Sequence, residues 1–225
     1  AMLIVIENFL DAAELADYRA QLSTANWIDG AQSAGTRSVA VKQNFQLDRG
    51  DALATALGNR ILTKLGHHPL FQSASLAEKI WPPVFNRDQD GGHYGVHVDS
   101  ALMRLSEAGL TIRSDLSATI FLTDPQDYDG GELVIEGQYG AQSVKLEAGD
   151  MVLYPSSSLH QVTPVTRGAR ECAIFWLQSA VADGAARAML FDLDQSIQAL
   201  SAGRAQDDAD IDRLIHVYHN LLRRC

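Results

Sequence analysis

The chain has 225 residues, of which 46% are hydrophobic and 20% charged, a balance that supplies a sizeable core and excludes a disordered chain. A formal net charge of −10 and a pI near 5.0 argue against a nucleic-acid partner, since such proteins carry basic patches. No apolar run approaches the roughly 18 residues needed to cross a bilayer, and the first residues lack the pattern of a secretory signal, so no membrane association is expected.

The first part of the chain, about residues 1–78, is predicted to be helical. Asp11 followed three residues later by Glu14 is typical of a helix start, and apolar residues continue at helical spacing. A second helix is predicted from Asp51 to Leu65, ending at Gly66.

From Lys79 the pattern changes to short β-rich runs separated by Asp-Gly, Gly-Gly and Pro-Ser turns. The predicted strands are Lys79–Phe85, Leu116–Leu122, Glu132–Glu136, Ser143–Leu146, Met151–Tyr154, Gln161–Val165 and Ala173–Gln178. Many short strands with frequent turns favour a sandwich or a barrel, which we expect to form a core over about residues 79–180.

The last part of the chain, about residues 181–225, is predicted to be helical again. Helices are expected from Ala185 to Leu200 and from Ile211 to Leu222, each with apolar residues along one side. Such a stripe usually covers the core, and the alternative is a homodimer contact through these C-terminal helices. Because the sequence has no internal repeat, we expect one domain over residues 1–225, with a mainly β, α+β fold.

A metal site is predicted from three residues. Alternate side chains of an extended strand project from the same face, so His97 and Asp99 are expected to point together. His160 follows the apolar run Met151–Pro155, where one strand ends and another begins, and several strands can fold back to place it beside the pair. Two imidazole nitrogens and a carboxylate with positions left open form the ligand set of non-haem Fe(II) sites. The alternatives are a chance His-x-Asp pair and a solvated turn histidine.

Arg170 follows His160 by ten residues and is predicted to bind a carboxylate. Its guanidinium offers a planar two-pronged fork that lysine cannot reproduce. The alternative is a surface arginine beside Arg167. Ser117 and Thr119 alternate along a predicted strand, so their hydroxyls are expected to face the same pocket, unless they bond to the backbone instead.

Six segments carry recognisable motifs: Phe85-Asn86-Arg87, Gly91-Gly92-His93, His97-Val98-Asp99, Arg113–Thr119, Asp127–Leu133 and Tyr154–His160. They resemble those of the bacterial PKHD-type hydroxylases, close relatives of the prolyl 4-hydroxylases, and the similarity covers nearly the whole chain. The resemblance implies a double-stranded β-helix, or jelly roll, with the cofactors Fe(II) and 2-oxoglutarate. It makes His97, Asp99 and His160 the iron ligands and Arg170 the partner of the far carboxylate of 2-oxoglutarate.

The resemblance also implies a reaction. A dioxygenase of this kind hydroxylates an unactivated carbon while decarboxylating 2-oxoglutarate to succinate and carbon dioxide, with ascorbate as the reductant. Its substrate would be a peptidyl residue, a free amino acid or a small iron-chelating metabolite, and the sequence does not select among them.

Two residues depart from the family pattern. Asp88 stands where an aromatic residue is expected, and Tyr94 stands where phenylalanine is common. We expect Tyr94 and Thr119 to lend hydroxyls to the cosubstrate site. The alternative for Tyr94 is a ring that packs at the mouth of the barrel.

Two rival functions use the same ligands: a non-catalytic, cupin-like metal-binding or iron- and oxygen-sensing module, and a zinc-dependent hydrolase. Arg170 counts against both, because neither needs a cation there. Cys172 and Cys225 do not form the pattern of a disulfide framework, which favours a reducing cytoplasm where iron stays ferrous.

Overall fold

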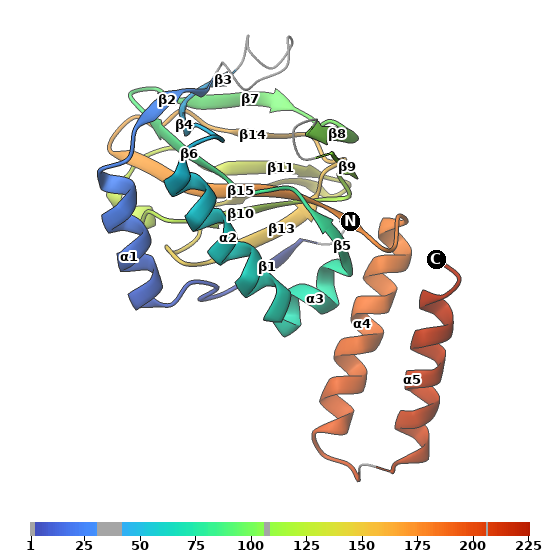
Figure 1. The fold of residues 1–225 in the computed structure, drawn as a ribbon. Coiled ribbons are helices and arrows are strands. Elements are labelled where there is room, and N and C mark those ends of the chain that lie inside the picture. Colours follow the sequence, from blue (N-terminus) through green and yellow to red (C-terminus); the bar gives the residue numbers. More distant parts are fainter. Residues whose placement is uncertain (1–2, 31–41, 106–108, 206) are drawn as a thin grey trace.

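Two antiparallel sheets face each other in the computed structural model, which describes residues 3–30, 42–105, 109–205 and 207–225 (Figure 1). The larger sheet has the order β1 (Ile4–Ile6), β13 (Met151–Pro155), β10 (Leu116–Phe121), β15 (Ala169–Ser179), β6 (Val84–Gln89), β4 (Phe45–Leu47) and β2 (Trp27–Asp29), with β5 (Ala77–Ile80) also paired to β15. The smaller sheet has the order β12 (Gly140–Val144), β11 (Leu133–Gly137), β14 (His160–Val162), β7 (His93–His97) and β3 (Lys42–Gln43). A hairpin of β8 (Leu102–Leu105) and β9 (Leu110–Arg113) forms a separate pair. The predicted α+β jelly roll is confirmed.

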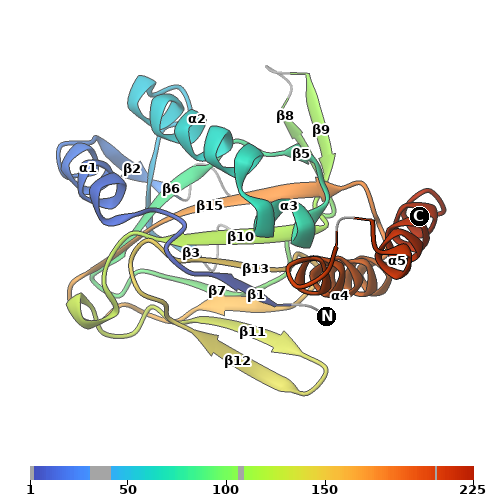
Figure 2. The ribbon, with the colours of Figure 1, turned by 90° about the horizontal axis from the view of Figure 1, so that it is seen from below.

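Three helices cover the outer face of the larger sheet: α1 (Ala12–Ser23), α2 (Ala52–His67) and α3 (Pro69–Ser75) (Figure 2). Their apolar faces and the outward side chains of the sheet form the main core, which includes Tyr18, Leu57, Ile61, Phe71, Phe85 and Phe175. The Tyr18 hydroxyl donates to the Leu57 carbonyl oxygen (2.9 Å) and so links α1 to α2. Because the helices bury the outer face of the larger sheet, its inner face is the one that borders the space between the two sheets.

In the central strand β10, successive side chains alternate between the two faces of the larger sheet. Leu116, Ala118 and Ile120 point into the main core, whereas Ser117 and Thr119 point into the space between the sheets. All residues of the strand are buried. The alternation therefore delivers two hydroxyls to the interior of the jelly roll, as predicted.

The predicted helix start at Asp11 is also confirmed. The Asp11 carboxylate accepts from the Glu14 backbone N–H (2.8 Å), and the Glu14 carboxylate accepts from the Asp11 backbone N–H (2.9 Å). These reciprocal bonds form a capping box, which satisfies two N–H groups that a helix start leaves without intrahelical partners.

Removal of this cap gives a measurable loss of stability. We expect Asp11→Ala to lower the free energy of unfolding by about 1 kcal/mol, the usual cost of losing an acidic N-cap. Urea denaturation followed by circular dichroism measures the difference, and an unchanged midpoint would show that the cap contributes nothing.

The first 78 residues contain strands as well as the predicted helices. They contribute β1, β2, β3 and β4, and β5 begins within them at Ala77. These strands have two to four residues each, too few to show an alternating pattern. Except for β2, which pairs with β4, each pairs with a strand that follows much later in the chain, as β1 does with β13. Strands β8 and β9 and the short helix α3 are likewise absent from the prediction, whereas β15 is longer than its predicted core of Ala173–Gln178. An extended strand is expected only for the His97–Asp99 pair, and β7 (His93–His97) ends at His97.

The predicted C-terminal helices are present as α4 (Gly184–Ser201) and α5 (Ala209–Leu222). They pack on each other as a hairpin that extends away from the sheets (Figure 1). Ile215, Val217 and Leu221 of α5 remain exposed. Across the described ranges, none of the helices has the length and apolar character needed to span a bilayer.

Candidate active site

A cavity of about 330 Å³ lies between the two sheets. All the residues predicted to bind a metal or cosubstrate line it: His97, Asp99, His160, Arg170, Tyr94 and Thr119. Strands β7 and β14 are neighbours in the smaller sheet, and β10 and β15 are neighbours in the larger one. The jelly roll therefore gathers side chains from distant parts of the sequence into one site.

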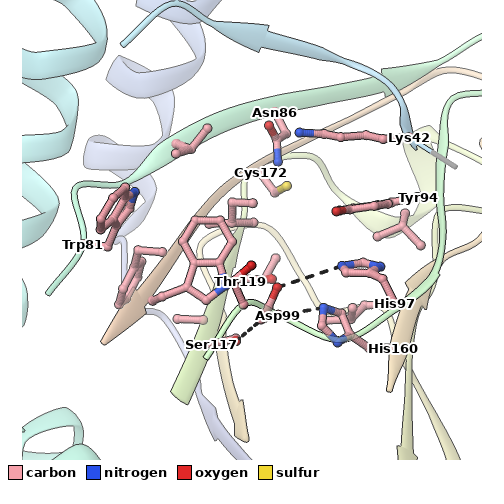
Figure 3. A pocket seen from close by; sticks show the side chains of 18 of the residues that line it. Lys42, Trp81, Asn86, Tyr94, His97, Asp99, Ser117, Thr119, His160 and Cys172 are labelled. Carbon is pink, nitrogen blue, oxygen red and sulfur yellow. Dashed lines mark hydrogen bonds and ion pairs between the residues drawn. The ribbon is translucent and has the colours of Figure 1, made fainter. Parts of the chain in front are cut away.

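Three potential metal ligands converge in this cavity (Figure 3). His97 ends β7, and His160 begins β14 directly opposite it. Asp99 lies two residues beyond the end of β7, with Oδ1 4.0 Å from His97 Nε2 and Oδ2 3.7 Å from His160 Nε2. One ligand atom from each residue lies within 4.8 Å of the others, so the three can share one ion. We call His97, Asp99 and His160 the triad.

Both histidines present the nitrogen that a metal needs. His97 Nδ1–H donates to the Gly95 carbonyl oxygen (2.7 Å), and His160 Nδ1–H donates to the Ser158 carbonyl oxygen (3.0 Å). Each bond fixes the tautomer that leaves Nε2 unprotonated toward the centre. Burial, and then the adjacent His160, lower the pKa of His97 to about 4, so this ring is neutral at pH 7.

The carboxylate of Asp99 is oriented by a short chain of hydroxyls. Ser117 Oγ donates to Asp99 Oδ2 (2.6 Å), and Ser117 Oγ also lies 2.7 Å from Ser156 Oγ. Both serines are buried. Ser117 thus supports the predicted ligand, which is the kind of outer contact that orients metal ligands in proteins.

Aromatic rings hold the two imidazoles in place. Tyr94 stacks on His97 with ring centroids 3.5 Å apart and an interplanar angle of 17°. Tyr154 meets His160 edge to face at 5.2 Å. The Tyr94 ring packs at the site, and its hydroxyl points into the cavity (Figure 3).

Arg170 is buried in the cavity wall, with 2% of its surface exposed. Its Nη1 donates to Asp88 Oδ2 (2.9 Å), and the two residues are cross-strand partners on β15 and β6. Nε has no hydrogen-bond partner among the described residues. Gly131 makes room for the side chain, because a Cβ there would approach Arg170 Cδ to 2.9 Å. The second glycine of the Gly-Gly motif that precedes β11 therefore accommodates this arginine, whereas a Cβ at the first, Gly130, would meet the Pro164 carbonyl oxygen.

The other arginines near the predicted motifs lie elsewhere. Arg167 pairs with Asp129 at the surface (2.8 Å), and Arg113 pairs with Asp115 (2.7 Å). Neither is among the residues that line the cavity, whereas Arg170 is. The structure therefore favours Arg170 over both as a partner for a bound carboxylate.

Several residues of the site were not predicted from the sequence. Asp88 was noted only as an unusual residue, and its pairing with Arg170 depends on the register of β6 and β15. Tyr154 belongs to an apolar run, and only the strand alternation turns it inward. Lys42 and Trp81 line the cavity as isolated side chains next to short or irregular segments, where the sequence offers no periodic signal.

The site matches known family models. Residues 83–178 match a model described as the 2OG-Fe(II) oxygenase superfamily, and residues 184–225 match the PKHD-type hydroxylase C-terminal domain. The first match spans the triad and Arg170, and the second spans the α4–α5 hairpin.

Similar proteins agree with these matches. The chain is 58% identical over 223 residues to a PKHD-type hydroxylase of Teredinibacter turnerae, covering 99% of this chain and 98% of the relative. A PKHD-type hydroxylase of Acidovorax ebreus is 57% identical over the same length and coverage. Among solved structures, a Pseudomonas putida prolyl-4-hydroxylase superposes with a TM-score of 0.51 at 20% identity, covering 79% of this chain and 92% of the other. HygX from Streptomyces hygroscopicus, with nickel and 2-oxoglutarate bound, gives a TM-score of 0.53 at 14% identity, covering 79% and 82%.

Proposed function

The chain belongs to the PKHD-type hydroxylases of the 2OG-Fe(II) oxygenase superfamily, and on that premise we propose that the triad holds its ferrous iron. The enzyme is a 2-oxoglutarate-dependent hydroxylase. The observation that carries the assignment of ligands is the convergence of two Nε2 atoms and one carboxylate within 4.8 Å. Neutral imidazoles with Nε2 unprotonated and an ionised carboxylate are the donors that Fe(II) accepts.

We propose that Arg170 binds the far carboxylate of 2-oxoglutarate. A buried guanidinium with an unpartnered Nε is suited to a buried carboxylate, because charge-assisted bonds of this kind are strong in a dry site. Tyr94 and Thr119 are proposed to add hydroxyl contacts from the cavity wall. Asp88 already binds one nitrogen of Arg170, and this contact holds the guanidinium in a fixed orientation.

The chain's own residues bind and orient the reactants. Iron and 2-oxoglutarate, when bound, supply the oxidising chemistry that releases succinate and carbon dioxide and hydroxylates an unactivated carbon. The backbone bonds of His97 and His160 fix both rings, and Ser117 fixes Asp99. The two sheets flank the cavity, so a substrate bound there is held with one carbon positioned against the reacting groups.

Slow turnover without substrate tests this function. Purified protein with ferrous iron, ascorbate, oxygen and 2-oxoglutarate is expected to form succinate at a low rate, because enzymes of this class decarboxylate some cosubstrate unproductively. Asp99→Ala provides the control, since free iron would give the same background in both samples. Equal succinate from both proteins, with no 2-oxoglutarate binding by calorimetry, would favour the cupin-like binding module instead.

Three further properties are proposed with this function. Ascorbate would keep the iron reduced between cycles. The exposed apolar residues of α4 and α5, among them Met189, Ile215 and Leu221, support a homodimer formed through these helices. A cytoplasmic location would suit a ferrous site and is consistent with the free thiols of Cys172 and Cys225.

A further inference from the structure

A second cavity, of about 530 Å³, lies where the jelly roll meets the C-terminal hairpin. Its walls come from the start of β10, the turn that follows β13 and the start of α4. Among the described residues, none lines both this cavity and the active-site cavity. The two cavities are therefore separate, although both border β10.

The wall of the second cavity contains one buried cation, Arg187, which is 4% exposed. Its Nη1 donates to the Val181 carbonyl oxygen (2.7 Å), and this is the one hydrogen bond that the side chain forms with the described residues. Nε and Nη2 have no acceptor among them. These two nitrogens form the edge of a guanidinium that can donate to both oxygens of a carboxylate.

The nearby carboxylates are engaged elsewhere. Asp115 also lines the cavity, but Arg113 donates to both of its oxygens, from Nε to Oδ1 (2.7 Å) and from Nη2 to Oδ2 (2.8 Å). Asp183 caps α4 by accepting from the Ala186 backbone N–H (2.6 Å). Neither acid forms an ion pair with Arg187 in the described part of the chain. The buried guanidinium therefore lacks a carboxylate of its own.

The electrostatic surroundings of Arg187 agree with this. Burial lowers its pKa, and the attraction of Asp115 and Asp183 does not offset that effect. Arg113 and Arg167, each of which binds a carboxylate, have a raised pKa instead. A carboxylate at Nε and Nη2 would supply the partner that the charged form of Arg187 needs in a buried position.

The start of α4 favours an anion at the same place. Gly184 leaves the guanidinium accessible on one side, since a Cβ there would lie 3.6 Å from Arg187 Nη2. Helix α4 has 18 residues, and its N-terminal end carries the positive pole of the helix dipole. The dipole and the guanidinium therefore attract negative charge to one end of the cavity.

The rest of the wall indicates the class of ligand. Its apolar side chains include Leu116, Ala182, Ala185 and Ala188, and the three alanines occupy little of the space. One uncompensated cation suits a single negative charge, and the adjacent Asp115 would repel a ligand with two. The volume lies in the range of small-molecule sites. A ligand with one carboxylate and an apolar body fits these features.

We propose that the second cavity binds a small monocarboxylate, with its carboxylate on Arg187 and its apolar portion against Leu116 and the alanines of α4. The proposal does not depend on the triad, on iron or on 2-oxoglutarate. It gives the C-terminal hairpin a part in ligand binding, because Arg187 belongs to α4.

The test compares an acid with its neutral amide. Protein loaded anaerobically with ferrous iron and 2-oxoglutarate is titrated by calorimetry with benzoate and with benzamide. We expect benzoate to bind at least about tenfold more tightly, since one charge-assisted bond is worth that much. Arg187→Met should abolish the difference, and Arg187→Lys, which keeps the charge but loses the fork, should retain part of it. Ala188→Leu narrows the cavity and keeps the guanidinium, so it should weaken benzoate even if Arg187→Met is unstable.

The controls separate this site from the active site. Arg213→Met removes an exposed arginine of the same hairpin and should behave as wild type. The visible band of the iron complex should not change as benzoate is added. No binding of benzoate, equal constants for acid and amide, or a preference that survives in both Arg187→Met and Ala188→Leu would overturn the inference. The dependence on Arg187 is expected without iron and 2-oxoglutarate as well, so a wild type that forms no iron complex would contradict the proposed function and leave this test intact.

Discussion

Alanine at His97, Asp99 or His160 is expected to lower the affinity for ferrous iron by more than about a hundredfold, since even the outer partners of metal ligands are worth ten- to a hundredfold. Each substitution removes one of three protein ligands from a site that keeps open positions. The remaining two donors would form a chelate too weak to compete with buffer. Iron content after anaerobic loading and desalting measures the effect.

His93→Ala is the matched control for these variants. His93 lies on the same strand as His97, and its ring is bonded to the Gly91 carbonyl oxygen (2.9 Å), but it does not belong to the triad. This variant should load iron like the wild type, and circular dichroism should show an intact fold in all four. Stoichiometric iron in any two of the triad variants would contradict the assigned ligands.

Substitution of Arg170 is expected to weaken 2-oxoglutarate without affecting iron. Loss of a charge-assisted bond to the far carboxylate costs about 1.5–3 kcal/mol, which raises the dissociation constant by about ten- to a hundredfold. Arg170→Lys keeps the charge but loses the fork, so it should show a large part of the effect. Anaerobic titration of the iron-loaded protein with 2-oxoglutarate measures the constant directly.

The ion pair with Asp88 shapes the design of this experiment. Arg170→Ala alone would leave the Asp88 carboxylate buried without its partner, which costs about 3–5 kcal/mol of stability and can unfold the protein. The double variant Arg170→Ala with Asp88→Asn removes that charge and separates binding from folding. Arg167→Lys, at the surface, serves as the control. If the dissociation constant for 2-oxoglutarate is unchanged in Arg170→Lys and in the double variant, another cation binds the far carboxylate.

The sequence predicted those elements whose signals are local. The capping box at Asp11, the buried run of β10 and the helices α4 and α5 each show their pattern within a few turns or one strand. The placement of His97, Asp99 and His160 in one cavity was also predicted, because short motifs of the chain resemble a family that shares them. Their geometry still required the structure, since Asp99 lies outside β7 rather than on the strand itself.

Other features depend on contacts between distant segments. Strand β4 pairs with β6, and this pairing places Gln46 beside Asn86, a buried polar contact that no local pattern in the sequence indicates. The partner of Asp88 is set by the register between β6 and β15. The position of Lys42 opposite Tyr94 depends in the same way on the pairing of β3 with β7. Pairings of this kind leave no periodic trace in the chain.

The most direct test of the site is the visible spectrum of the protein with ferrous iron and 2-oxoglutarate in the absence of oxygen. A cosubstrate that chelates iron held by the triad gives a weak charge-transfer band. We expect the wild type to develop this band in proportion to added 2-oxoglutarate until the iron is saturated, and we expect Asp99→Ala and His160→Ala to show none. Absence of the band in the wild type, or a protein that retains zinc and does not respond to 2-oxoglutarate, would contradict the account.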